Sequence, residues 1–127
     1  DSAKEVLNDL EKGGKRPKGI IAVSLFGQCP DMDELLELGK EFSIFVIEDA
    51  CQSFGARYKE RPSCGLTDLA VTSFFPAKPL GCYGDGGMVF ARDKTMLERL
   101  RAIRNHGQRR QYLHEEIGVN SRLDTLQ

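Results

Sequence analysis

The segment Ile44-Phe45-Val46-Ile47-Glu48-Asp49 decides the fold class, because a short apolar run ends abruptly in two carboxylates. A run without polar alternation is typical of a strand that is buried on both faces of a sheet. A similar run, Ile20 to Phe26, precedes it, and Asp31 begins a helical pattern of leucines that continues toward Phe42. The order strand, helix, strand predicts an α/β fold with a largely parallel sheet.

Further elements extend this pattern in both directions. Val6, Leu7 and Leu10 predict a helix that ends at Gly13-Gly14. After the central strand we expect two more strands, then a helix capped by Asp93, and finally the first residues of another helix. These elements are Ala70 to Phe75, Gly87 to Ala91, Asp93 to His106-Gly107, and Ser121 to Gln127.

Composition restricts the function more than the fold. A length of 127 residues suits one domain, and a net charge of −1 gives no reason to expect nucleic acid as a partner. No apolar run is long enough to cross a bilayer, so we expect no membrane and a cytoplasmic location. The four cysteines and two histidines show no metal-ligand spacing, which predicts free thiols and no metal site.

Reactive side chains follow two of the predicted strands. Asp49 ends the central strand with Gln52 three residues later, and Ser73 lies in the next strand, five residues before Lys78. Ligands bind beyond the carboxyl ends of parallel strands, so these groups converge if the two strands are neighbours. A lysine that forms a Schiff base and a carboxylate that keeps a pyridine nitrogen protonated suit pyridoxal 5'-phosphate (PLP). A serine hydroxyl can bind the cofactor phosphate, and Gln52 can bind the phenolic oxygen of its ring.

Each of these residues also has an ordinary structural explanation. Taken singly, Lys78 fits a solvated surface charge, Asp49 a helix cap and Ser73 a common strand residue. The glycines between Gly81 and Gly87 resemble a phosphate-binding loop, but no helix follows them, so they favour a flexible turn. A cluster of arginines is consistent with either a phosphate patch or a solvated helix face: Arg99, Arg101, Arg104, Arg109 and Arg110.

Four blocks of sequence together indicate a family. Val46 to Ala56 resembles the "viEDaaqsfGa" segment of the DegT/DnrJ/EryC1/StrS aminotransferases, and Thr72 to Gly81 resembles their lysine segment. Gly84 to Gly87 is similar to the glycine turn that follows, and Gly118 to Asp124 is similar to "G-x-N-x-R-x-D". The blocks occur in the family's order and span most of the chain from Ile20 onward.

The resemblance implies a PLP enzyme of fold type I, a three-layer α/β fold, that works as a homodimer with active sites between subunits. It implies that residues 1–127 form part of the large, PLP-binding domain. It also assigns one role to each matching residue. Lys78 is the Schiff-base lysine, Asp49 the partner of the pyridine nitrogen, Gln52 a ring contact and Ser73 a phosphate contact. Asn120 reaches the cofactor phosphate of the other subunit, and Arg122 and His106 contact the substrate.

The reaction implied is a two-stage transamination that takes an amino group from glutamate to a keto nucleotide sugar. The segments Phe26 to Cys29, Cys82 to Gly87 and Asn120 to Gln127 resemble one branch most. That branch aminates C3 of a UDP-linked 2-acetamido-3-keto uronic acid on the way to surface polysaccharide, and C4 amination is the alternative.

Three other functions remain open. A PLP-dependent sugar dehydratase of the same family carries a histidine in place of Lys78. A regulatory or binding protein would not need Lys78, Asp49 and Ser73 together. A dinucleotide-binding enzyme is disfavoured because the glycine turn opens no helix.

Members of this family are considerably longer than 127 residues. The resemblance implies that an N-terminal part and a smaller C-terminal domain are absent. We therefore expect this chain alone to bind PLP poorly, to have little transaminase activity, and to self-associate through exposed apolar surface.

Overall fold

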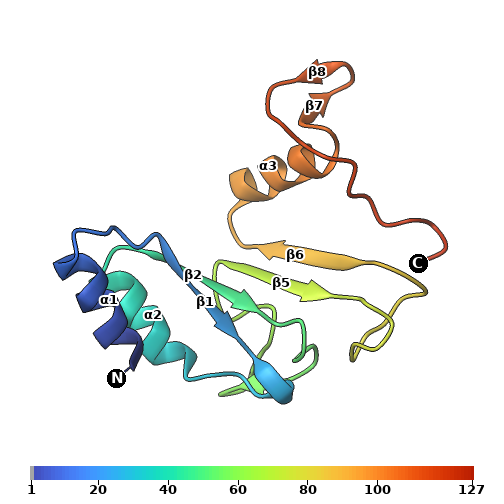
Figure 1. The fold of residues 1–127 in the computed structure, drawn as a ribbon. Helices are drawn as coiled ribbons and strands as arrows, with labels where there is room; N and C mark the ends of the chain where they lie inside the picture. Colours follow the sequence, from blue (N-terminus) through green and yellow to red (C-terminus); the bar gives the residue numbers. More distant parts are fainter. Residues whose placement is uncertain (1) are drawn as a thin grey trace.

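A computed structural model describes residues 2–127, and its centre is a four-stranded sheet (Figure 1). The strand order is β1 (Gly19–Val23), β2 (Phe45–Asp49), β5 (Leu69–Ser73) and β6 (Gly87–Ala91). The first three strands are mutually parallel, and β6 pairs with β5 in the antiparallel direction. This arrangement confirms the α/β class and the mostly parallel sheet.

Three helices flank the sheet: α1 (Ser2–Lys12), α2 (Met32–Glu41) and α3 (Lys94–Arg104). An ion pair of 2.7 Å between Lys4 and Glu41 joins α1 to α2, and α2 packs on β1 and β2. Gly39 permits this close packing, because a Cβ atom there would lie 2.6 Å from Cγ2 of Val46. In Figure 1, α3 lies beside β6, away from the α1–α2 pair.

Both predicted aspartate caps occupy the N-cap positions, but only one caps through its side chain. The Asp93 carboxylate accepts a hydrogen bond of 2.7 Å from the Met96 N–H at the start of α3. Asp31 makes no such bond to α2 and instead accepts one from the Tyr58 hydroxyl. Asp31 therefore ties the start of α2 to the segment that follows β2.

One predicted strand boundary and one predicted helix are wrong. The strand expected over Ile20 to Phe26 ends at Val23, and a 3-10 turn, η1 (Leu25–Gly27), follows with Phe26 in the left-handed region at φ 54°. Ser121 to Gln127 forms no helix. So short a segment does not hold a helix by itself, and its last side chain bonds to the Tyr83 backbone instead.

Two short hairpins were not predicted from the sequence. They are β3 (Arg57–Tyr58) with β4 (Arg61–Pro62), and β7 (Gln108–Arg110) with β8 (Leu113–His114). Both are too short to show a hydrophobic period of two, which is the signal that reveals longer strands.

The two faces of the sheet are packed differently. One face holds the buried cluster of Ala22, Met32 and Leu66. The opposite face leaves Ile21 67% and Phe45 73% exposed, which is unusual for large apolar side chains in a sheet. This open face fits the expected self-association, which stays a prediction.

The described residues 2–127 contain no helix that combines the length and the apolar character needed to cross a membrane. Within the same range all four cysteines are free, half-buried thiols, and no cluster of metal-ligating side chains forms.

Gly107 offers a sharp test of the packing after α3. Its φ is +71°, and a Cβ atom there would lie 1.6 Å from the Glu116 carbonyl oxygen. We expect Gly107→Ala to lower the free energy of unfolding by about 3 kcal/mol, since it adds a backbone clash to the cost of a left-handed alanine. The matched control is Gly14→Ala, where φ is also +71° but nothing lies within 4 Å of the added atom. Urea unfolding would contradict the argument if the two substitutions had equal effects.

Candidate active site

The pairing of β2 with β5 brings the predicted reactive residues to one edge of the sheet. Asp49 at the end of β2 stands opposite Val71 of β5, and Ser73 follows two residues later on the same face. A hydrogen bond of 2.9 Å from the Ala50 N–H to the Val71 carbonyl joins the two strand ends. The Thr72 hydroxyl adds a second bond of 3.1 Å to the Ala50 carbonyl. The predicted convergence required β2 and β5 to be neighbours in the sheet, and they are.

Asp49 is half-buried and held in a fixed turn. Its Oδ1 accepts a hydrogen bond of 3.0 Å from the Cys51 N–H. The carboxylate lies on the open face of the sheet, the same face that exposes Ile21 and Phe45. A carboxylate held in this way can accept a further hydrogen bond from a protonated ring nitrogen.

Ser73 ends β5, and Lys78 lies in the following loop, which backbone hydrogen bonds close. The Ser73 hydroxyl oxygen accepts a bond of 3.1 Å from the Phe75 N–H, so its own proton remains available to an acceptor such as a phosphate oxygen. The Lys78 N–H donates to the Phe75 carbonyl at 2.8 Å, and the Cys82 N–H donates to the Phe74 carbonyl at 2.8 Å. Lys78 therefore sits in a short turn with its side chain half-buried.

The pKa of the Cys51 thiol responds to the charges of both Asp49 and Lys78. Burial raises the pKa of Cys51 to about 11, and the Asp49 carboxylate contributes to the rise. The Lys78 ammonium acts in the opposite sense and lowers that pKa. The hydrogen bond from the Cys51 N–H places the Asp49 carboxylate beside this residue, and the charge of Lys78 also influences its thiol.

The raised pKa of Cys51 predicts a thiol that is inert near neutral pH. At pH 8 a pKa of about 11 leaves only about 0.1% of the thiol as thiolate, which is the reactive form. We expect alkylation by iodoacetamide at Cys51, followed by peptide mass mapping, to accelerate about tenfold for each pH unit up to about pH 11. A rate that levels off near pH 8.5, the ordinary range of a thiol, would contradict this environment. The Cys51→Ala variant shows which alkylated peptide belongs to Cys51, because that peptide should be missing from its map.

Glu48 supports the site from the opposite face of β2. Its carboxylate is fully buried and accepts two backbone hydrogen bonds, from the Cys64 N–H at 2.8 Å and the Leu66 N–H at 3.1 Å. The Thr67 hydroxyl oxygen accepts a third bond, of 3.3 Å, from the Glu48 N–H. Sequence reasoning assigned Glu48 no role, although a carboxylate on the core face of an apolar strand is a recognisable signal.

Gln52 and the remaining predicted residues lie outside this group. Gln52 is exposed in the turn after β2. The last three, His106, Asn120 and Arg122, gather at the carboxyl end of α3. The His106 N–H donates to the Val119 carbonyl at 3.0 Å, and Arg122 Nε donates to Asn120 Oδ1 at 3.2 Å.

The C-terminal segment connects this second group to the lysine loop. The Gln127 side-chain oxygen accepts a hydrogen bond of 2.7 Å from the Tyr83 N–H. Leu123 packs on the glycine turn, since its Cδ1 atom would lie 2.9 Å from a Cβ atom placed on Gly86. The residue after Arg122 is therefore in contact with the turn that follows Lys78.

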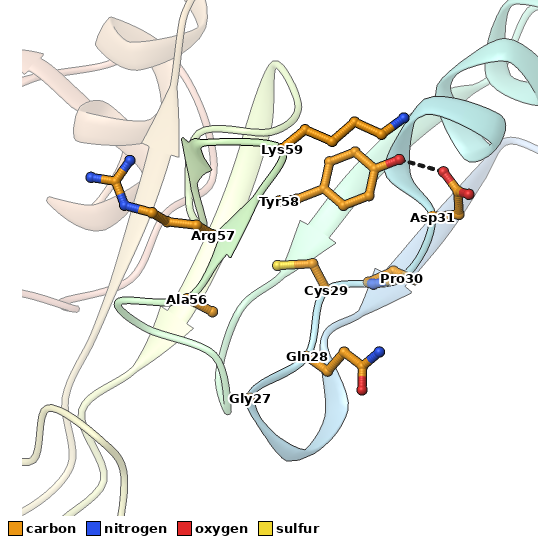
Figure 2. Close-up of a pocket in the computed structure, with 9 residues that line it drawn as sticks. All are labelled: Gly27, Gln28, Cys29, Pro30, Asp31, Ala56, Arg57, Tyr58 and Lys59. Atoms are coloured by element: carbon orange, nitrogen blue, oxygen red, sulfur yellow. Dashed lines mark hydrogen bonds between the residues drawn. The ribbon is translucent and has the colours of Figure 1, made fainter.

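A pocket of about 600 Å³ lies elsewhere, between the loop after β1 and the β3 segment. Figure 2 shows its lining, in which the Tyr58 hydroxyl points to Asp31 and Cys29 lies between the two segments. None of the predicted site residues lines this pocket. Its size alone therefore does not mark it as the reactive centre.

The comparison with known families decides the classification. The model of the DegT/DnrJ/EryC1/StrS aminotransferase family matches residues 9–127. This chain belongs to that family. Among relatives of this aminotransferase-family chain, the UDP-2-acetamido-2-deoxy-3-oxo-D-glucuronate aminotransferase of Pseudomonas aeruginosa is 57% identical over 112 residues. That alignment covers 88% of the chain but only 31% of the relative.

Solved structures support the classification of this DegT/DnrJ/EryC1/StrS chain. A family aminotransferase from Brucella abortus superimposes with a TM-score of 0.91 at 40% identity, over 95% of this chain and 33% of that one. NtdA from Bacillus subtilis, solved with its cofactor PMP bound, superimposes with a TM-score of 0.75 at 27% identity, over 87% and 25%. The chain therefore spans about a third or less of the length of these relatives.

Proposed function

We propose that the complete protein containing this chain is a PLP-dependent aminotransferase that acts on a keto nucleotide sugar. The observation that supports the proposal is the β2–β5 pairing, which brings the strand ends with Asp49 and Ser73 to one sheet edge, with Lys78 in the loop that follows β5. An amine, a hydroxyl with a free proton and a carboxylate with acceptor capacity are the groups that PLP requires. The residues present therefore fit the cofactor.

Each residue of the chain has a distinct role in the proposal. Lys78 Nζ would bind the cofactor aldehyde covalently, and the Asp49 carboxylate would hold a proton on the pyridine nitrogen. The Ser73 hydroxyl would donate to the phosphate, and Gln52 would contact the ring. Bound PLP supplies an electron sink for the electrons released when a proton leaves the substrate carbon. Lys78 Nζ, once displaced, would carry that proton between substrate and cofactor carbons.

The substrate and the partners follow from the relatives. The activity of the 57% identical relative supports a UDP-linked 3-keto uronic acid as acceptor, with amination at C3. We propose glutamate as the amino donor and a homodimer as the working form. In that dimer Asn120 would serve the partner's cofactor, while Arg122 and His106 would contact the sugar.

The complete protein allows a direct test of this function. Purified with PLP, it should show the visible absorbance of lysine-bound cofactor, and glutamate should abolish that absorbance while 2-oxoglutarate accumulates. Adding the 3-keto nucleotide sugar should restore the absorbance. Absence of any bound-cofactor absorbance with excess PLP would reject the proposal and leave a regulatory or binding role for this fold.

A further inference from the structure

We propose that a second pocket, at the carboxyl end of α3, binds the diphosphate of the nucleotide-sugar substrate; this rests on the function proposed above. The pocket has a volume of about 480 Å³, and four arginines and one carboxylate line it: Arg101, Arg104, Arg109, Arg122 and Glu98. These arginines come from α3, from β7 and from the C-terminal segment. The fold therefore concentrates positive charge that the sequence spreads over more than twenty residues.

The charge of this pocket suits a doubly charged anion. Arg109 is neutralised by Glu115 at 3.0 Å and Glu116 at 3.2 Å. Arg101, Arg104 and Arg122 form no ion pair with any described residue, so after subtraction of Glu98 the pocket keeps an excess of two positive charges. Guanidinium groups bind phosphate oxygens with two parallel hydrogen bonds, which makes a diphosphate a matching ligand.

The helix end does not oppose an anion as strongly as a free helix end does. A free carboxyl end carries partial negative charge on its unpaired carbonyls. Here the Ala102 carbonyl accepts from the Gly107 N–H, the Ile103 carbonyl from the Val119 N–H, and the Arg104 carbonyl from the Ser121 N–H, at 2.8–2.9 Å. With these carbonyls bonded, the arginine side chains dominate the local field.

The position of the pocket fits the remote end of a long substrate. Because β6 runs opposite to β2 and β5, it leads away from the reactive edge, and α3 leads back toward it (Figure 1). Arg122 reaches the pocket, and the next residue, Leu123, packs on the glycine turn after Lys78. The pocket is thus linked to the lysine loop without belonging to it, as expected for a subsite that holds the nucleotide part.

The test uses the complete PLP-loaded protein and the double substitution Arg101→Gln with Arg104→Gln. Isothermal titration with UDP and with inorganic pyrophosphate should show Kd values raised by at least about tenfold for both, because two charged bidentate contacts are lost. Uridine, which lacks phosphate, should bind as it does to the unmodified protein. The matched control is Arg110→Gln, which lies just outside the pocket lining and should change the UDP Kd less than about twofold.

Several outcomes separate this inference from the function on which it rests. A UDP Kd unchanged by the double substitution overturns the pocket assignment even if glutamate still converts the cofactor. Equal weakening of uridine binding overturns it too, since the effect would not reside in the phosphates. If the double variant does not fold, Arg101→Lys with Arg104→Lys keeps the charge, and UDP should bind it more weakly through loss of the bidentate geometry. An inert cofactor with normal UDP binding would reject the proposed function alone.

Discussion

Lys78→Ala in the complete protein should abolish transamination and covalent cofactor attachment together. Lys78 carries the amine in the closed loop after Ser73. The charges of Lys78 and Asp49 shift the pKa of the Cys51 thiol in opposite directions. Loss of the proposed covalent and proton-transfer roles should lower kcat by at least about three orders of magnitude. The measurement is steady-state turnover, combined with borohydride reduction and mass mapping of the labelled peptide.

The control for Lys78 is Lys15→Ala, an exposed lysine far from the sheet edge in sequence. It should retain normal turnover and a label on Lys78. A borohydride label that persists on another lysine in Lys78→Ala, or turnover reduced less than about tenfold, would place the reactive amine elsewhere.

Glu48→Ala should be among the most destabilising single substitutions in this part of the protein. The buried carboxylate accepts the Cys64 and Leu66 N–H groups, and its removal leaves a half-buried donor and a buried donor without a partner. At about 1–3 kcal/mol for each orphaned group, we expect the free energy of unfolding to fall by about 3 kcal/mol. Urea or thermal unfolding of the complete protein measures the loss.

Two further variants isolate the cause of that loss. Glu37→Ala removes an exposed carboxylate from α2 and should cost less than about 0.5 kcal/mol. Glu48→Gln keeps one acceptor oxygen and should lose roughly half of the Glu48→Ala effect. If Glu48→Ala were as stable as the control, the two backbone bonds would not anchor the loop beneath Asp49.

The sequence predicted the class of the fold because its strands are apolar runs and its helices are periodic. It placed β2, β5 and β6 within two residues of their ends, and the strands that carry Asp49 and Ser73 are neighbours, as the predicted convergence required. These successes rest on local patterns and on the rule that ligands bind beyond the carboxyl ends of parallel strands.

What the sequence did not predict depends on contacts between distant segments. The 3-10 turn at Leu25 to Gly27 ends the strand inside a mostly apolar run, and the extended tail up to Gln127 is held by Tyr83, 44 residues earlier. The pocket of arginines combines α3 with Arg122, although the sequence showed only a row of basic residues. Neither propensity nor spacing reports such pairings.

The closed loop between β5 and β6 has a consequence for the evolution and engineering of this protein. The ladder pair Ser73–Gly87 fixes both ends of the segment, and the Cys82-to-Phe74 bond closes a smaller loop around Lys78. An insertion or deletion inside the smaller loop therefore changes the position of the amine while the strand register stays intact. The length of this loop can therefore vary independently of the sheet, and it sets the position of the lysine.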